Sequence, residues 1–327
     1  MQEDKITRLR QLVNQSIAEM EQNKEPHELY DPISYSLSVG GKRVRPVLCL
    51  LSHQLFGGRI DDSVLMPAIG LEVFHGFTLI HDDIIDGAEI RRGQPTVYKK
   101  WSVNNAILSG DAMSIESYRL MSQCSSKYLN DILAVFNKTA AMVCEGQQLD
   151  MNFEHSPVIT EEEYLYMIEL KTAVLMAAAS KIGAISAGAS IPECDALYKF
   201  GLKLGLAFQI QDDILDTFGD PKVFGKAIGG DIATNKKTYL LVTALRLATG
   251  SDLKQLNGLL TNRDMDKDER YKQMKAIYDK LNVKEHADKK VNELFAEAIA
   301  HLNSIKQPDN RKADLICFAE NLTDRKA

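Results

Sequence analysis

The segment "VLMPAIGLEVFHGFTLIHDDII", Val64 to Ile85, is long and apolar, and it ends beside two adjacent aspartates. Its apolar residues recur at the spacing of a helix, while alternating runs typical of strands are scarce throughout the chain. The sequence therefore predicts an all-α fold. Helices are expected over 64–85, 106–150, 161–186, 194–216 and 239–249, and loops over 53–62, 87–102, 154–160 and the glycine-rich stretch 218–238.

Composition limits the class of protein. The chain has 327 residues, 45% of them hydrophobic, and no shift of composition marks a boundary, so we expect one domain over 1–327. A net charge of -6 argues against a nucleic-acid partner. Five cysteines without CxxC spacing predict reduced thiols and a cytoplasmic protein. No uninterrupted apolar run suits a signal peptide or a membrane span, so stable membrane insertion is not expected.

Two similar aspartate clusters occur in apolar surroundings, "HDDIID" and "QDDILD". Residues four apart share one face of a helix, so each cluster offers a pair of carboxylates. If the two helices face each other across a bundle, the crowded carboxylates need cations, and Mg²⁺ suits oxygen ligands and phosphates. Chance solvated clusters are the alternative interpretation, and an EF-hand is excluded by Ile84 and Gly93 at its third and twelfth positions. The predicted metal ligands are Asp82, Asp86, Asp212 and Asp216.

Basic residues lie near both clusters along the chain. The motif "GGKRVRP" combines glycines with Lys42, Arg43 and Arg45, which are donors suited to a phosphate group. Lys171 stands alone in an apolar helix, where it must snorkel, pair or bind a ligand. Each cation taken singly fits a solvated surface equally well. Together with Arg91, Arg92, Lys226 and Lys236 they predict a site for two diphosphates, one bridged by Mg²⁺ and one held by Lys and Arg.

The ordered motifs "GGKRVRP", "HDDIID", "RRG", "GQQLD", "KT", "QIQDDILD" and "NKKT" resemble those of the trans-isoprenyl diphosphate synthases, the polyprenyl synthetase family. The resemblance implies an all-α bundle with a central cavity, a homodimer and about three Mg²⁺ ions per site. It implies catalytic roles for Asp82, Asp83, Asp86, Arg91, Lys171, Asp212 and Lys226. It implies binding of isopentenyl diphosphate by Lys42, Arg45, His75 and Arg92, and of the allylic diphosphate by Arg91, Lys171, Thr172, Gln209, Lys226 and Lys236.

One motif departs from the family pattern, because Asn235 stands where a glycine is usual before the last lysine. Asparagine also tolerates the left-handed backbone conformation, so we expect the turn to be kept. The histidines beside the first cluster, His75 and His81, are poor candidates for ligands of Mg²⁺, which prefers oxygen.

The implied reaction is a Mg²⁺-dependent head-to-tail condensation of isopentenyl diphosphate with an allylic diphosphate. A longer-chain synthase and, less well supported, a terpene cyclase are the alternatives, and a non-catalytic partner subunit would lack intact aspartate motifs. The apolar stretch from about Ala106 to Val143 is a candidate dimer interface. In the family, an aromatic residue five positions before the first aspartate goes with short products, so we expect C15 to C20 and favour C20. The residues expected to limit chain length are Phe77, Thr78 and Phe74.

Overall fold

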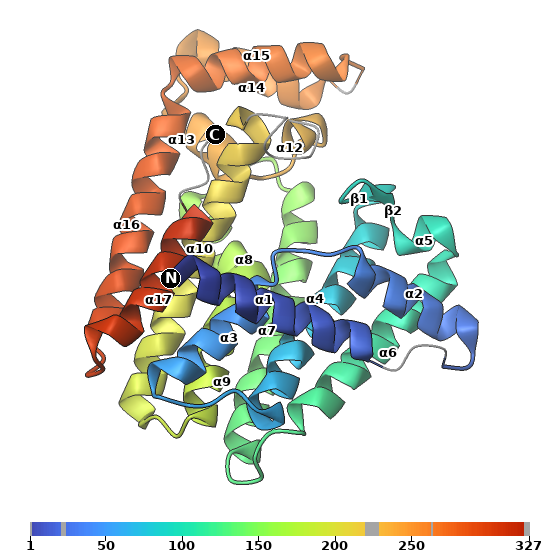
Figure 1. Cartoon of the computed structure of the whole chain (residues 1–327). Coiled ribbons are helices and arrows are strands. Elements are labelled where there is room, and N and C mark those ends of the chain that lie inside the picture. The colour runs from blue at the N-terminus through green and yellow to red at the C-terminus, as the bar shows by residue number, and fades with distance from the viewer. Residues whose placement is uncertain (1, 21–23, 220–228, 263, 324–327) are drawn as a thin grey trace. The chain divides into compact units, whose positions relative to one another are not determined.

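The structure is a computed structural model that describes residues 2–20, 24–219, 229–262 and 264–323, and it is almost entirely helical there (Figure 1). The all-α prediction is confirmed. The chain divides into two compact units, and helices α7, α9, α10, α16 and α17 have residues in both. The first unit is Met1–Lys138, Leu175–Tyr198 and Leu302–Phe318, and the second is Thr139–Val174, Lys199–His301 and Ala319–Ala327. The single domain over 1–327 stays a prediction.

The first unit is built around one long apolar helix, α4. It packs against α3 and α6. Two glycines permit this approach, since a Cβ at Gly76 would lie 2.5 Å from Met113 Cε and one at Gly70 would lie 3.1 Å from the Ser117 carbonyl oxygen. Its elements are α1 (Gln2–Glu19), α2 (His27–Ser38), α3 (Val44–Leu55), α4 (Asp62–Ile85), β1 (Ile90–Arg91), β2 (Gln94–Pro95), α5 (Val97–Lys100), α6 (Val103–Met121) and parts of α7 (Leu129–Glu154), α9 (Val174–Ser186), α10 (Ile191–Phe218), α16 (Val283–Asn303) and α17 (Asp309–Thr323).

Helix α4 is more apolar than expected, since no run suited to a membrane span was predicted. Among the described residues it is the one helix long and apolar enough to cross a membrane by length and composition. Its apolar window is 67% buried inside the structure, as in the core helix of a globular protein.

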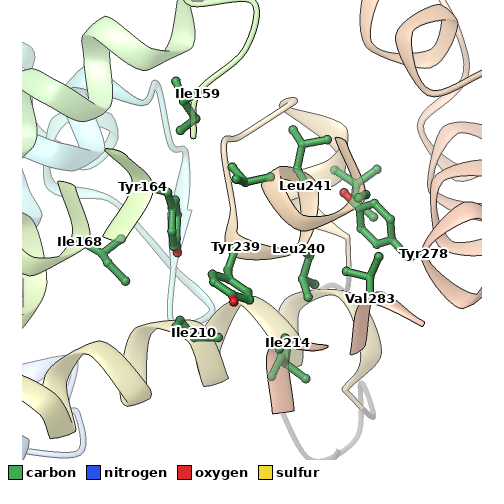
Figure 2. Close-up of a cluster of buried hydrophobic side chains, with 14 of the residues drawn as sticks. Ile159, Tyr164, Ile168, Ile210, Ile214, Tyr239, Leu240, Leu241, Tyr278 and Val283 are labelled. Carbon is green, nitrogen blue, oxygen red and sulfur yellow. The ribbon is translucent and has the colours of Figure 1, made fainter. Parts of the chain in front are cut away.

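The second unit surrounds a separate apolar cluster, in which α10 contributes Ile210 and Ile214 (Figure 2). Tyr164 of α8 and Tyr239 of α13 are part of the same cluster and are 2% exposed. These two tyrosines carry polar groups into the core. The elements are α8 (Glu161–Ile168), a π-helical turn η1 (Glu169–Ala173), α12 (Gly230–Ala233), α13 (Tyr239–Leu247), α14 (Gly250–Thr261), α15 (Lys267–Lys280) and the remaining parts of α7, α9, α10, α16 and α17.

The predicted helices are confirmed except one. A single helix over 106–150 is wrong, because α6 ends at Met121 and α7 begins at Leu129. The intervening "SQCSSKY" contains neither glycine nor proline, so the usual turn signals were absent. The predicted loop over 87–102 contains the short β1–β2 hairpin and α5. The loop over 154–160 is confirmed, and α8 begins with a capping box between Thr160 and Glu163.

Candidate active site

The first aspartate cluster lies where α4 ends. The Asp86 N–H donates to the Asp82 carbonyl oxygen at 2.8 Å, so the final turn is intact and the two residues are one helical turn apart. Asp82 is half-buried and Asp86 is exposed, whereas Asp83 is buried. The two aspartates predicted to bind metal are therefore the two that a ligand can reach.

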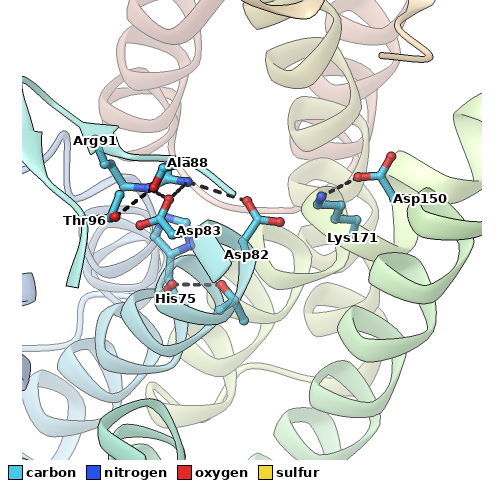
Figure 3. A network of polar contacts seen from close by, with 9 residues as sticks. His75, Asp82, Asp83, Ala88, Arg91, Thr96, Asp150 and Lys171 are labelled. Carbon is cyan, nitrogen blue, oxygen red and sulfur yellow. Dashed lines mark hydrogen bonds and ion pairs between the residues drawn. The ribbon is translucent and has the colours of Figure 1, made fainter. Parts of the chain in front are cut away.

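Asp83 instead binds an arginine of the hairpin. Arg91 Nε and Nη2 both lie 2.7 Å from Asp83 Oδ1, and Nη2 is 3.6 Å from Asp82 Oδ2 (Figure 3). Burial raises the pKa of Asp83 to about 6, although the Arg91 charge opposes the rise. Thr96 closes the connecting loop, because its hydroxyl donates to the Ala88 carbonyl oxygen at 2.7 Å. Asp83 and Arg91, which are both predicted to be catalytic, are thus joined directly by an ion pair and a hydrogen bond.

Arg92, one of the residues predicted to hold isopentenyl diphosphate, follows Arg91 in the chain and contacts the "GGKRVRP" motif. The Arg92 guanidinium donates to the Gly40 carbonyl oxygen, and a Cβ at Gly41 would lie 2.8 Å from Arg92 Nη1, so a side chain at position 41 would displace the guanidinium. Burial lowers the pKa of His75 well below its usual value, and the positive charges of Arg45 and Arg92 lower it further. His75 is therefore a neutral imidazole among cations. Lys42 is exposed just before α3.

Arg43 differs from its neighbours in the "GGKRVRP" motif. It is 5% exposed, and its guanidinium donates to Glu72 at 2.9 Å, to the Leu37 carbonyl oxygen at 2.7 Å and to Asn14 at 2.8 Å. Its suggested use as a phosphate donor is wrong, because every nitrogen of its guanidinium already has a protein partner. Arg43 joins α1, α2, α3 and α4 instead.

The second aspartate cluster lies on α10 and has a buried middle member too. Asp213 is 4% exposed and accepts hydrogen bonds from the Tyr164 hydroxyl, from the Tyr239 N–H at 2.9 Å and from Gln209 Nε2 at 3.2 Å. Burial and the nearby Asp231 raise the pKa of Asp213 to about 7. Asp212 and Asp216 are half-buried, and Asp216 Oδ2 accepts the Asp231 N–H at 3.0 Å.

Lys171 and Thr172 lie in the π-helical turn η1, a feature often found at functional sites. Lys171 Nζ pairs with Asp150 Oδ2 at 2.5 Å, which resolves how a lone lysine is accommodated in this helix (Figure 3). Thr172 donates to Gln209 Oε1 at 3.2 Å. A Cβ at Gly146 of α7 would lie 2.2 Å from the Lys171 nitrogen, so this glycine lets α7 pack directly on the turn.

The residues expected to limit chain length form one aromatic group on α4. The Phe77 ring centroid is 5.3 Å from that of Phe74 and 4.9 Å from that of His81, and Phe74 also contacts Phe136. Thr78 donates to the His75 carbonyl oxygen at 2.8 Å. His81 Nε2 lies 3.1 Å from the Ile107 carbonyl oxygen, so it points to α6.

The accessible carboxylates are oxygen ligands of the kind that Mg²⁺ prefers. Within residues 2–20, 24–219, 229–262 and 264–323, no three His, Cys, Asp or Glu side chains are grouped closely enough to hold a metal by themselves. Mg²⁺ commonly takes one or two carboxylates together with substrate phosphates, and the accessible pairs Asp82/Asp86 and Asp212/Asp216 suit that arrangement. Whether the two clusters face each other across one cavity stays a prediction.

Two further predicted residues belong to the glycine-rich stretch of sequence 218–238. Lys226 lies outside the described residues. Lys236 is exposed, and its N–H donates to the Asp231 carbonyl oxygen at 2.9 Å. Asn235 has a φ of +54°, which confirms the expected left-handed turn.

A cavity of about 840 Å³ in the second unit is lined by residues of α8, α13, α14 and α16. None of the predicted site residues lines it. Tyr239 lines this cavity, and its hydroxyl donates to Glu161 there at 3.0 Å. Its N–H donates to Asp213 of the second cluster at 2.9 Å. Sequence reasoning missed Asp150, Tyr164 and Tyr239 as partners of the site. Asp150 stood in the quoted "GQQLD" motif, whereas the tyrosines read as ordinary core residues.

The chain is similar to known proteins over most of its length. The chain is 39% identical over 252 residues to the geranylgeranyl diphosphate synthase of Methanosarcina mazei, covering 76% of this chain and 78% of that protein. It is 38% identical over 261 residues to the geranylfarnesyl diphosphate synthase of Natronomonas pharaonis, covering 74% and 76%.

Solved structures are similar over nearly the whole chain. A crystal structure of a geranylgeranyl pyrophosphate synthase has a TM-score of 0.93 and 38% identity, covering 98% of this chain and 99% of that one. That of the Corynebacterium glutamicum geranylgeranyl pyrophosphate synthase, complexed with isoprenyl diphosphate and magnesium, has a TM-score of 0.85 and 27% identity, covering 99% and 97%. The sequence model of the polyprenyl synthetase family matches residues 26–279. The chain therefore belongs to the polyprenyl synthetase family.

Proposed function

We propose that the protein condenses isopentenyl diphosphate head to tail with an allylic diphosphate to give a short-chain all-trans prenyl diphosphate. The observation that carries the proposal is the repeated arrangement of the aspartates, in which two members of each cluster are accessible and the middle one is buried. Related proteins named as prenyl diphosphate synthases support it.

In this reaction the allylic C1–O bond breaks and diphosphate leaves. The double bond of isopentenyl diphosphate forms a new bond to that carbon, and a proton then leaves the isopentenyl unit. Arg45, His75 and Arg92 would hold isopentenyl diphosphate, while Lys171 and Lys236 would neutralise charge on the allylic diphosphate. Holding both substrates in register removes much of the entropic barrier.

Mg²⁺ would be held by Asp82, Asp86, Asp212 and Asp216 together with substrate oxygens, with about three ions per site. When bound, it supplies positive charge to the departing diphosphate. The magnesium in the Corynebacterium glutamicum structure supports the choice of a divalent cation. Asp83 and Asp213 would support the metal ligands without binding metal themselves, because each is buried and bound to other residues of the protein.

We propose products of C15 to C20, with C20 favoured. Phe77 and Phe74 form an aromatic group on α4 one to two turns before Asp82, where a growing chain would end. A longer-chain synthase is the alternative, since one relative is named for a C25 product.

We also propose a cytoplasmic homodimer. Leu108 and Ile115 are 59% and 72% exposed and lie seven residues apart, on one face of α6. Exposed apolar residues on one face typify an interface. Ile115→Lys should raise the fraction of monomer in light scattering. An active wild-type species with the mass of one 36.5 kDa chain would contradict the dimer.

The test of the function is an assay with isopentenyl diphosphate and an allylic primer, with and without Mg²⁺. Dephosphorylated products are then separated by chromatography. We expect C15 and C20 alcohols only with Mg²⁺. Cyclic hydrocarbons from the allylic substrate alone would indicate a terpene cyclase, and no product at all would indicate a non-catalytic subunit.

A further inference from the structure

Asn235 does more than adopt the left-handed backbone conformation that a glycine would also adopt. Its side-chain Nδ2 donates to the Leu260 carbonyl oxygen of α14 at 3.2 Å, and its Oδ1 accepts from Arg270 Nη1 of α15 at 3.1 Å. Glycine offers neither bond. The residue directly before Lys236 is thereby attached to two helices.

Arg270 is buried, and among the described residues its Nε has no hydrogen-bond partner. It is 5% exposed, and its Nη2 donates to the Asn262 carbonyl oxygen. Burying a guanidinium is costly where its donors are unsatisfied, so the loss of Asn235 would leave a second buried nitrogen of Arg270, Nη1, unpaired. Asn235 and Arg270 therefore depend on each other.

The neighbouring Tyr271 holds the other end of the same segment. Its hydroxyl donates to the Thr217 carbonyl oxygen of α10 at 2.8 Å, and a Cβ at Gly229 would lie 2.5 Å from the Tyr271 ring. Gly229 N–H donates to the Asp216 carbonyl oxygen at 2.7 Å. Two neighbouring residues of α15 thus contact residues 229–238 at two points, Gly229 and Asn235.

We infer that Asn235, Arg270 and Tyr271 form a brace that fixes residues 229–238 against α10. The brace positions Lys236 and, through the Asp231 N–H, the carboxylate of Asp216. Because this segment is fixed in advance, less freedom is lost when the allylic diphosphate binds. These three are positioning residues, and the inference rests on the proposed function of the site.

Asn235→Gly is the first test, since glycine keeps the left-handed turn and removes only the side-chain bonds. Asn282→Gly is its matched control, because Asn282 has a φ of +51° and lies in the same unit, between α15 and α16. We expect Asn235→Gly to raise KM for the allylic substrate roughly tenfold, as for lost hydrogen bonds to a charged group, and to leave KM for isopentenyl diphosphate within about twofold. Asn282→Gly should change neither.

Arg270→Met tests the coupling, with Lys272→Met on the exposed face of α15 as control. If the brace acts as one unit, the double variant Asn235→Gly/Arg270→Met should have a KM for the allylic substrate within about twofold of that of Arg270→Met. The reason is that the second change removes a hydrogen bond that the first has already broken. Should Arg270→Met fail to fold, Asn235→Gly still decides. Calorimetric binding of geranyl thiodiphosphate, a substrate analogue that ionises poorly, should weaken in step with the KM values.

The two ideas fail in different ways. No condensation by the wild type would overturn the proposed function. An active wild type in which Asn235→Gly behaves like Asn282→Gly in both KM and analogue binding would overturn the brace. The brace would also be overturned if the double variant raised KM for the allylic substrate by the product of the two single effects.

Discussion

The two aspartate clusters have nearly the same sequence, yet they hold their middle residue by opposite means. Asp83 is paired with a charged arginine that is 30% exposed. Asp213 is bound by neutral donors, the Tyr164 hydroxyl, the Tyr239 N–H and Gln209. Charge stabilises an ionised carboxylate strongly, whereas neutral donors in a buried site leave it closer to protonation. The first cluster is thus supported by electrostatics and the second by hydrogen-bond geometry.

The largest expected effect tests what the clusters share. Asp82→Ala and Asp212→Ala each remove a proposed metal ligand, and losing one such contact in the transition state costs about 2.7 to 4 kcal/mol. Turnover with Mg²⁺ should fall by roughly a hundredfold or more in both variants. Steady-state assays would measure it. Asp195→Ala, which removes an exposed carboxylate on the same helix α10, is the control and should remain near wild type. Normal turnover of Asp212→Ala would remove the second cluster from the mechanism.

The next prediction uses pH to separate the clusters in the metal-free protein. A buried aspartate whose pKa is raised keeps a proton that the unfolded chain has lost, so the free energy of unfolding falls as pH rises to the folded pKa. For Asp83 the fall ends near pH 6, and for Asp213 near pH 7. Between pH 6 and 7 the slope should reach up to about 1.4 kcal/mol per pH unit and come mainly from Asp213.

Urea unfolding with a chelator at pH 5, 6, 7 and 8 would measure this slope. Asp213→Asn should remove the fall between pH 6 and 7. Asp83→Asn should leave that part unchanged and flatten only the fall below pH 6. The same curve for both variants would mean that the clusters are supported alike.

Salt sharpens the comparison further. Arg91→Met leaves Asp83 without its cation, and Tyr164→Phe removes one neutral donor from Asp213. Each should lower the free energy of unfolding by about 1 to 3 kcal/mol. Because salt screens a partly exposed ion pair, the cost of Arg91→Met should shrink at about 1 M salt, while that of Tyr164→Phe should not. Urea titrations at low and high salt would show it. Tyr166→Phe, on the exposed face of α8, is the control and should cost little at either salt concentration.

The smallest expected effect on rate concerns the helix of the first cluster alone. Phe77→Ala opens space beside Phe74 without touching an aspartate, so condensation should continue and products should lengthen beyond those of the wild type. Chromatography of the dephosphorylated alcohols would show the shift. Phe153→Ala, which removes a partly buried ring in the second unit, should leave product length unchanged. An unchanged distribution in Phe77→Ala would place the limit on chain length elsewhere.

Sequence alone went furthest where spacing determines geometry. The four-residue spacing of Asp82/Asp86 and Asp212/Asp216 identified the accessible carboxylates, and the backbone tolerance of asparagine identified the turn at Asn235. Spacing could not show that Asp83 and Asp213 are buried, because burial depends on the hairpin and on tyrosines distant in sequence. The role of Arg43 was missed for the same reason, since Glu72, its partner, lies 29 residues away.

The π-helical turn η1 has a consequence for how the second unit is assembled. Tyr164 and Ala173 both contact α10, at Asp213 and Gly205 respectively. Nine residues apart in a regular α-helix, at about 100° each, they would face opposite sides. The π-helical turn holds one extra residue, which changes the angle between Tyr164 and Ala173 around the helix axis so that both face α10. A one-residue deletion within Glu169–Ala173 would leave the two residues eight apart in an even helix, about 80° around its axis, so both contacts should survive while the π-helical turn that carries Lys171 and Thr172 is lost.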